Sequence, residues 1–118
     1  ASPFAPLIRI GINVQMGLDY CCGEEAFYME MLQMFQSQCE EKKTEIISLY
    51  ENANWADYAI KVHALKSTSL TIGAELLSEL AKALEGAGKK ADEAYIRQHH
   101  PALLSRYDEV CACIATLQ

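Results

Sequence analysis

The sequence contains few residues that interrupt a helix, since only three of its 118 residues are proline and six are glycine. Five of these nine lie before residue 24, and most of the others lie at the ends of long segments that lack both residues. No segment alternates strictly between polar and apolar residues, as a half-buried strand would. These absences exclude a β-sheet protein and predict an all-α fold.

Long apolar runs and concentrated positive charge are also missing. No run approaches the roughly 18 apolar residues that cross a membrane, so we expect no membrane insertion of this domain. The ten Lys and Arg residues are scattered along a chain of formal net charge −6. This pattern leaves no basic stripe to bind the phosphates of a nucleic acid, and we expect no nucleic-acid partner.

The five cysteines do not form the even set of a secreted disulfide framework, and we recognise no signal peptide. We therefore expect reduced thiols and a cytoplasmic protein. A zinc site formed by Cys21, Cys22, Cys111 and Cys113 with a histidine is an alternative. Neither pair has the C-x₂₋₄-C spacing usual for structural zinc, so we expect no bound metal.

The length predicts a single domain, residues 1–118, with an N-terminal segment 1–23 and a bundle 24–117. Four long segments have the apolar periodicity of helices, and they span residues 24–52, 55–72, 74–87 and 91–116. The N-terminal segment supports only short helical pieces, such as residues 18–22. Because short turns join the four long segments, we predict an antiparallel up-down four-helix bundle with a short N-terminal helical segment.

Local signals predict where these helices begin and end. Asn54 can cap the second helix through its side-chain oxygen, and Gly73 is a natural residue after its end. Gly86 and Gly88 are expected to close the third helix, and Pro101 should kink or restart the fourth. The apolar stripe of the first helix is expected to comprise Phe27, Met31, Met34, Phe35, Cys39, Ile46, Leu49 and Tyr50.

His63 lies at the margin of the core-facing side of the second helix. On a helical wheel Val62 faces the core, and the strip beside it contains Ala59, His63, Lys66, Ser67 and Leu70. The small side chains of Ala59 and Ser67 leave the imidazole ring accessible. The ring is therefore expected to be neither fully buried nor on the outermost face.

An antiparallel turn centred near residue 74 brings Glu85 opposite His63 and Lys82 opposite Lys66. A carboxylate bonded to one ring nitrogen fixes the tautomer and makes the other nitrogen a better nucleophile. Lys66, with Lys82 or Lys89 as further candidates, would offset the roughly two negative charges of a phosphoryl group. Spacing alone also fits an ordinary histidine at a helix margin, with Glu85 only an i,i+4 partner of Lys89.

The segment that begins at His63 reads HALKSTSLTIGAELL and is followed by Ala83-Leu84-Glu85. It closely resembles the signature of histidine-containing phosphotransfer (HPt) domains, which is roughly H-x-L-K-G/S-x-x-x-x-(I/L)-G-A-x-x-L. Further matches are Gly17-Leu18, Gly23, residues 28–35 and Asn54-Trp55. The resemblance covers nearly the whole chain, from residue 17 to about residue 117.

The resemblance implies that His63 accepts a phosphoryl group from a receiver-domain aspartate and donates it to another. Lys66 matches the family's phosphate-stabilising lysine, and Glu85 matches the position that orients the histidine. No glycine loop of a P-loop protein or kinase is present, so we expect a carrier without autokinase activity rather than an enzyme. This chain should bind no cofactor, and Mg²⁺ is expected on the partner receiver domain.

The expected partners are response-regulator receiver domains, with a hybrid sensor histidine kinase as a further candidate. The resemblance implies that a receiver docks over the second helix and the adjoining face of the first. The candidate docking residues are Ala59, Ser67, Leu70, Met31, Phe35 and Gln38. Ser67 departs from the glycine that is common at its position, which bears on how closely the partner approaches.

Two other functions fit the same residues. A helical interaction or scaffold domain would keep this fold without using His63, and replacing His63 with Gln would then leave its function intact. An enzyme could use His63 as a general base with Glu85, but it would need an enclosed substrate pocket beside the ring.

Overall fold

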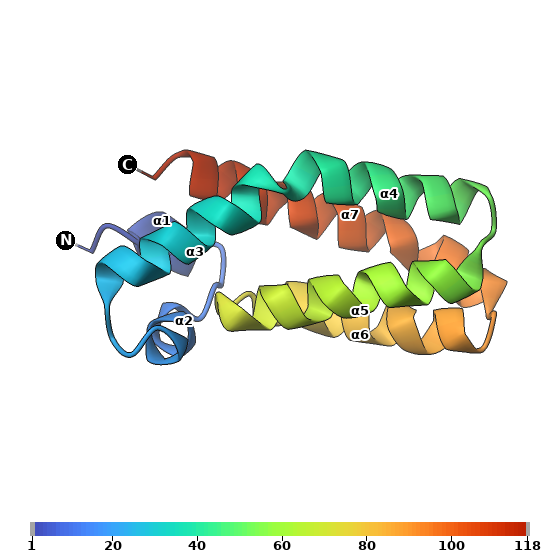
Figure 1. Cartoon of the computed structure of the whole chain (residues 1–118), viewed down its shortest axis with the longest axis horizontal. Helices are drawn as coiled ribbons and strands as arrows, with labels where there is room; N and C mark the ends of the chain where they lie inside the picture. Colours follow the sequence, from blue (N-terminus) through green and yellow to red (C-terminus); the bar gives the residue numbers. More distant parts are fainter. Residues whose placement is uncertain (1, 118) are drawn as a thin grey trace.

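The computed structural model describes residues 2–117, which are helical over most of their length and contain no strand (Figure 1). The helices are α1 (Ala5–Arg9), α2 (Val14–Tyr20), α3 (Glu25–Ser37), α4 (Cys39–Glu51), α5 (Trp55–Thr71), α6 (Glu75–Lys89) and α7 (Glu93–Ala115). Four long runs, α3 with α4, α5, α6 and α7, lie along the longest axis, and successive runs point in opposite directions (Figure 1). The predicted all-α fold is confirmed.

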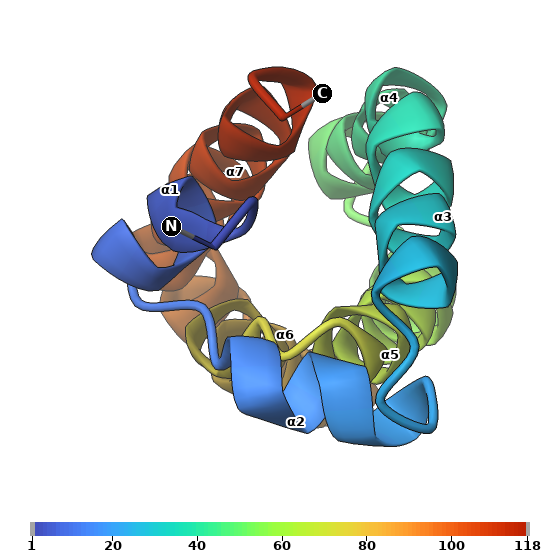
Figure 2. The same ribbon diagram turned by 90° about the vertical axis from the view of Figure 1, so that its left-hand side faces the viewer.

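Viewed from one end, the four runs surround a common core, and α2 crosses the end of α5 and α6 (Figure 2). The backbone N–H of Asn13 donates to the carbonyl of Gly73 at 2.8 Å, which ties the start of α2 to the turn between α5 and α6. Gly73 adopts φ +84°, as expected of a glycine that ends a helix. The predicted piece at residues 18–22 was misplaced, because Asn13 caps α2 at Met16 and the helix ends at Tyr20.

The first long run is not one helix. It breaks at Gln38, whose ψ of −3° departs from helical geometry, and α4 begins at the next residue. Lys42 still donates its backbone N–H to the Gln38 carbonyl at 3.1 Å, so α4 begins immediately after the break. The prediction of a single helix over residues 24–52 was therefore wrong at this position.

The predicted apolar stripe of this run was wrong for Phe27 and Met34, whose relative exposures are 47% and 56%. Tyr28 and Leu32 are fully buried instead. Both sets repeat every three or four residues, so periodicity did not separate them. Tertiary contacts did, because the Tyr28 hydroxyl donates to the buried carbonyl of Ile72 at 2.8 Å.

The ends of α5 agree with the prediction, since Asn54 accepts a hydrogen bond from the Asp57 N–H at 3.3 Å. Helix α6, in contrast, continues through Gly86 and Gly88, and Ala91 takes the left-handed conformation at φ +52°. Helix α7 continues through Pro101 without restarting. Pro101 lies on the exposed side of α7, where water can reach the backbone carbonyl that its missing N–H would have bonded.

Candidate functional site

His63 lies on α5, on the side that faces α6, and the two helices pack closely around it. Ser78 donates its hydroxyl to the carbonyl of Lys66 at 2.9 Å, which links α6 to α5 one turn beyond His63. Gly88 lies against Ala59 one turn before it, where an added Cβ would approach the Ala59 Cβ to 3.0 Å. These contacts fix the backbone on both sides of the histidine.

Glu85 joins three side chains beside this helix pair. Its Oε2 lies 2.6 Å from His63 Nδ1 and 3.1 Å from Lys89 Nζ, and its Oε1 lies 2.9 Å from Lys66 Nζ. The carboxylate is largely buried, with 8% of the side chain exposed. The structure therefore brings together His63, Glu85 and Lys66, the three residues that the sequence analysis singled out.

The charges around Glu85 determine which nitrogen of His63 carries a proton. The Lys66 ammonium, against the effect of burial and with the help of Lys89 and His63, lowers the pKa of Glu85 to about 2. At neutral pH the carboxylate is therefore ionised and can only accept hydrogen bonds. His63 consequently donates its Nδ1–H to Glu85, and in the neutral ring Nε2 keeps a free lone pair.

The free edge of the ring faces solvent, since 55% of the His63 side chain is exposed. A shallow hollow of about 270 Å³ lies beside His63 and is lined by Ala59, Ile60, His63, Glu85 and Lys89. A nucleophile at an open surface suits a reaction with a group presented by another macromolecule. The enclosed pocket that a general-base enzyme would need is not found beside His63 in the described residues.

Lys66 differs in one respect from the expectation that it faces a phosphate. Its ammonium is bound to Glu85, and 27% of its side chain is exposed. Lys82 is exposed and takes part in no ion pair within residues 2–117. Any charge compensation by Lys66 therefore requires its ammonium to contact the phosphate instead of, or together with, Glu85.

The candidate docking residues divide by exposure. Ser67, Leu70 and Gln38 are exposed and Met31 is half-buried, whereas Ala59 and Phe35 belong to the core. The Phe35 ring packs on Tyr107 with 5.5 Å between centroids. A small groove between α3 and α5 is lined by Met31, Met34, Phe35, Gln38, Thr68, Thr71 and Ile72.

Sequence reasoning missed two apolar side chains on the accessible surface. Ile60, one turn before His63, is 64% exposed, and Met34 lies beside the groove. Ile60 could have been found from the sequence, because it is a large apolar residue on the polar side of the helical wheel. The exposure of Met34 could not be predicted, because its helical spacing also fits a core position.

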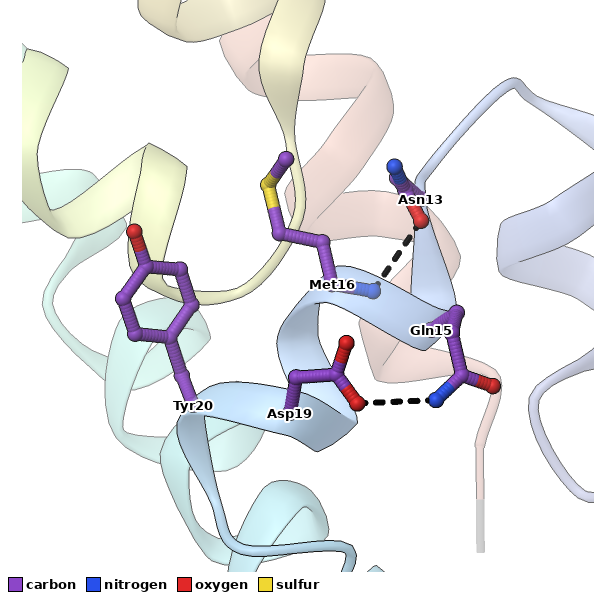
Figure 3. A pocket seen from close by; sticks show the side chains of 5 residues that line it. All are labelled: Asn13, Gln15, Met16, Asp19 and Tyr20. Atoms are coloured by element: carbon purple, nitrogen blue, oxygen red, sulfur yellow. Dashed lines mark hydrogen bonds between the residues drawn. The ribbon is translucent and has the colours of Figure 1, made fainter.

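A hollow larger than the one beside His63, about 490 Å³, lies along α2 (Figure 3). Its lining residues are Asn13, Gln15, Met16, Asp19 and Tyr20. Its polar groups are used locally: Asn13 caps Met16 at 3.0 Å, and Gln15 donates to Asp19 at 2.9 Å. It presents no nucleophile or charged cluster, so His63 remains the candidate site.

The cysteines are all free thiols, and Cys21 and Cys111 are buried. Burial raises the pKa of the Cys111 thiol, which keeps it protonated at neutral pH. Within residues 2–117 no three His, Cys, Asp or Glu side chains are arranged to hold a metal ion. No helix in the same range is long and apolar enough to cross a membrane.

The family model described as "Hpt domain" matches residues 30–117, a span that holds most of α3 and all of α4 to α7. No curated protein and no solved structure matches the chain. The family match confirms the resemblance that the segment after His63 indicated.

Proposed function

The chain belongs to the Hpt domain family, whose members act in phosphotransfer within two-component signalling, and from this premise we propose that it carries its phosphoryl group on Nε2 of His63. One observation carries the proposal. Glu85 accepts the Nδ1–H of His63 at 2.6 Å, so that the solvent-facing nitrogen is the nucleophile.

In the proposed step the Nε2 lone pair attacks the phosphorus of an aspartyl phosphate on a receiver domain. The P–N bond forms while the P–O bond to the aspartate breaks, and its electron pair returns to the aspartate as a carboxylate. The ring becomes an imidazolium that keeps its proton on Nδ1, and the negative charge of Glu85 stabilises it. The reverse reaction transfers the group to a second receiver aspartate.

Apart from the P–N bond at His63, the protein contributes positioning and charge, as is usual for phosphoryl transfer. We propose that the Lys66 ammonium compensates the phosphoryl oxygens and that Mg²⁺ is held by the receiver. Glu85, the carboxylate nearest the ring, is already paired with Lys66 and Lys89, which argues against a metal site of this chain at His63. The expected role is a carrier without autokinase activity.

The receiver is proposed to dock over α5 around His63 and over the adjoining part of α3. Ser67, Leu70, Met31 and Gln38 are accessible there, and Ile60 adds an exposed apolar contact. A hybrid sensor kinase that carries a receiver would use the same surface. Because these partners obtain phosphoryl groups from ATP, we propose that the chain works on the cytoplasmic side.

The test mixes the domain with Mg²⁺ and a phosphorylated receiver from the same organism, and measures acid-labile label on each protein. Three proteins are compared: wild type, His63→Gln and His99→Gln, in which a half-buried histidine stacked on Tyr95 is replaced. Label should move to the wild type and to His99→Gln but not to His63→Gln. With ATP and Mg²⁺ alone, no protein should acquire label.

Failure of transfer from every receiver of that organism would overturn the proposal and leave a helical scaffold as the better description. Label on His63→Gln equal to that on the wild type would do the same, because the group would then reside elsewhere.

A further inference from the structure

We propose that Lys89 is a positioning residue, which balances the charge of Glu85 while Lys66 turns from Glu85 to the phosphoryl group on His63. This inference rests on the proposed function of His63. It assigns a role to Lys89, which the proposed roles of His63, Lys66 and Glu85 do not include.

The geometry assigns the two lysines to different oxygens of one carboxylate. Lys66 binds Oε1 at 2.9 Å from α5, and Lys89 binds Oε2 at 3.1 Å from α6. Oε2 also accepts the Nδ1–H of His63, so Lys89 lies on the Nδ1 side of the ring. The phosphoryl group would be attached at Nε2, on the opposite edge of the imidazole.

The charge of the resting cluster exceeds what Glu85 requires. One carboxylate has two ammonium partners, and the form of His63 that attacks phosphorus is the neutral ring, which contributes no charge. Phosphorylation adds roughly two negative charges on oxygen and one positive charge on the ring. One ammonium is therefore available for the new group, provided that the other stays with Glu85.

Lys66 is the ammonium that lies nearer to His63 along the chain. It follows His63 by three residues on the same helix, and side chains at this spacing lie next to each other. Lys89 follows Glu85 by four residues on α6, the same kind of neighbouring spacing. In the phosphorylated state, Lys66 would thus lie one turn after the phosphoryl group on His63, and Lys89 would lie one turn after the Glu85 carboxylate.

Glu85 needs a counter-charge at that moment because it is largely buried, with 8% of its side chain exposed. A carboxylate with little access to water is stabilised as an anion by its partners. If Lys66 left and nothing replaced it, Glu85 would lose the partner that contributes most to its ionisation. Lys89 keeps the carboxylate ionised, so that it continues to hold Nδ1–H and to stabilise the imidazolium.

The transfer itself is the reaction proposed above, in which the P–N bond at Nε2 replaces the P–O bond to aspartate. No proton moves between Glu85 and His63. The only rearrangement added here is that the Lys66 ammonium exchanges Oε1 of Glu85 for the phosphoryl oxygens.

The experiment is a double-mutant cycle between positions 85 and 89. The proteins are wild type, Lys89→Gln, Glu85→Gln and the double variant, with Lys90→Gln as the matched control. Lys90 is an exposed lysine at the end of the same helix, and within residues 2–117 it has no ion-pair partner. Two quantities are measured: the fraction of label on the domain at equilibrium with a receiver, and the half-life of the isolated phosphorylated domain.

Lys89→Gln should lower the equilibrium ratio of labelled domain to labelled receiver by about three- to tenfold and shorten the half-life, whereas Lys90→Gln should change both less than about twofold. In the Glu85→Gln background the Lys89 substitution should have no further effect, because a neutral amide needs no counter-charge. This loss of effect would show that Lys89 acts through Glu85.

An equal effect of Lys89→Gln in both backgrounds would overturn the inference, because Lys89 would then act directly on the phosphoryl group or on the partner. Equal effects of Lys89→Gln and Lys90→Gln would overturn it as well, since only general charge would matter. Both results leave the proposed function standing. That function fails separately, if the wild type takes no label or if His63→Gln takes it.

Discussion

At the scale of single residues, Glu85 determines the chemistry of His63. The sequence was sufficient to predict that these two residues lie opposite each other, because they are equally far along the chain from a turn centred near residue 74. It was not sufficient to predict that Lys66 is bound to the same carboxylate. That contact depends on how the side chain turns within a local set of charges, which helical spacing does not encode.

Glu85→Gln is expected to slow phosphoryl acceptance by about tenfold or more, a typical effect of removing a group that orients a histidine. The amide keeps the shape of the carboxylate but offers no negative charge to the imidazolium. Single-turnover transfer from a phosphorylated receiver measures the rate. Glu79→Gln, the same change at an exposed position of α6, should leave it unchanged. Equal rates for Glu85→Gln and the wild type would contradict the role of Glu85.

His100 provides a test of the core that is independent of phosphotransfer. It is buried, stacks on Tyr50 at 3.8 Å between ring centroids, and lies 2.8 Å from the Tyr58 hydroxyl through Nδ1. Burial raises the pKa of Tyr58, so the hydroxyl stays protonated beside Nδ1 of the ring. Burial likewise lowers the pKa of His100 from 6.5 to about 4.

Between these two pH values the unfolded chain binds a proton at His100 and the folded chain does not. The free energy of unfolding should therefore fall as pH decreases from 6.5 to 4, by about 3 kcal/mol from this residue. Urea unfolding at a series of pH values measures it. The His100→Gln variant should lack this part of the pH dependence, and identical slopes for the two proteins would contradict the assignment.

At the scale of helices, the sequence predicted where α5 begins and ends, because Asn54 and Gly73 act within one turn of the chain. It was wrong about the buried side of α3, where two apolar stripes compete. Only contacts with distant residues, such as the hydrogen bond from Tyr28 to Ile72, decide between them. The two ends of α5 are thus set locally, whereas the orientation of a helix with two apolar faces is not.

The contact between α2 and α3 depends on a glycine. A Cβ at Gly17 would lie 2.3 Å from the Tyr28 ring and 2.9 Å from the Ile72 carbonyl. Gly17→Ala should therefore reduce the free energy of unfolding by about 1–3 kcal/mol. Gly86→Ala, where an added Cβ meets no atom within 4 Å, should increase it by about 0.5–1 kcal/mol. Thermal or urea unfolding distinguishes the two, and the same sign for both changes would contradict this packing.

At the scale of the whole molecule, the family match begins at residue 30, yet the core extends into the N-terminal segment. Phe4, Leu7 and Ile12 are at most 4% exposed, and Phe4 meets Tyr28 edge-to-face at 4.9 Å. The sequence predicted only that this segment lacks long helices. Which of its residues are buried depends on α1 and α2 packing on the rest of the bundle, and no periodicity in so short a segment encodes that.

Neighbouring residues of α1 test this extension of the core. Leu7 is fully buried and Ile8 is 54% exposed. Leu7→Ala should lower the free energy of unfolding by about 2–5 kcal/mol, whereas Ile8→Ala should change it by less than about 1 kcal/mol. Chemical unfolding of the two variants gives the comparison. Small and equal changes would mean that α1 does not contribute to the folded core.

In the proposed phosphorylated state the phosphoryl group resides on Nε2 of His63, and the Nδ1–H keeps its hydrogen bond to Glu85. The most direct measurement is NMR of the ¹⁵N-labelled domain after phosphorylation by a receiver, with ¹⁵N–³¹P couplings recorded for its three histidines. We expect one coupled nitrogen, Nε2 of His63, and a proton on Nδ1 of the same ring. Phosphorus on Nδ1, on His99 or His100, or on no histidine at all would contradict it.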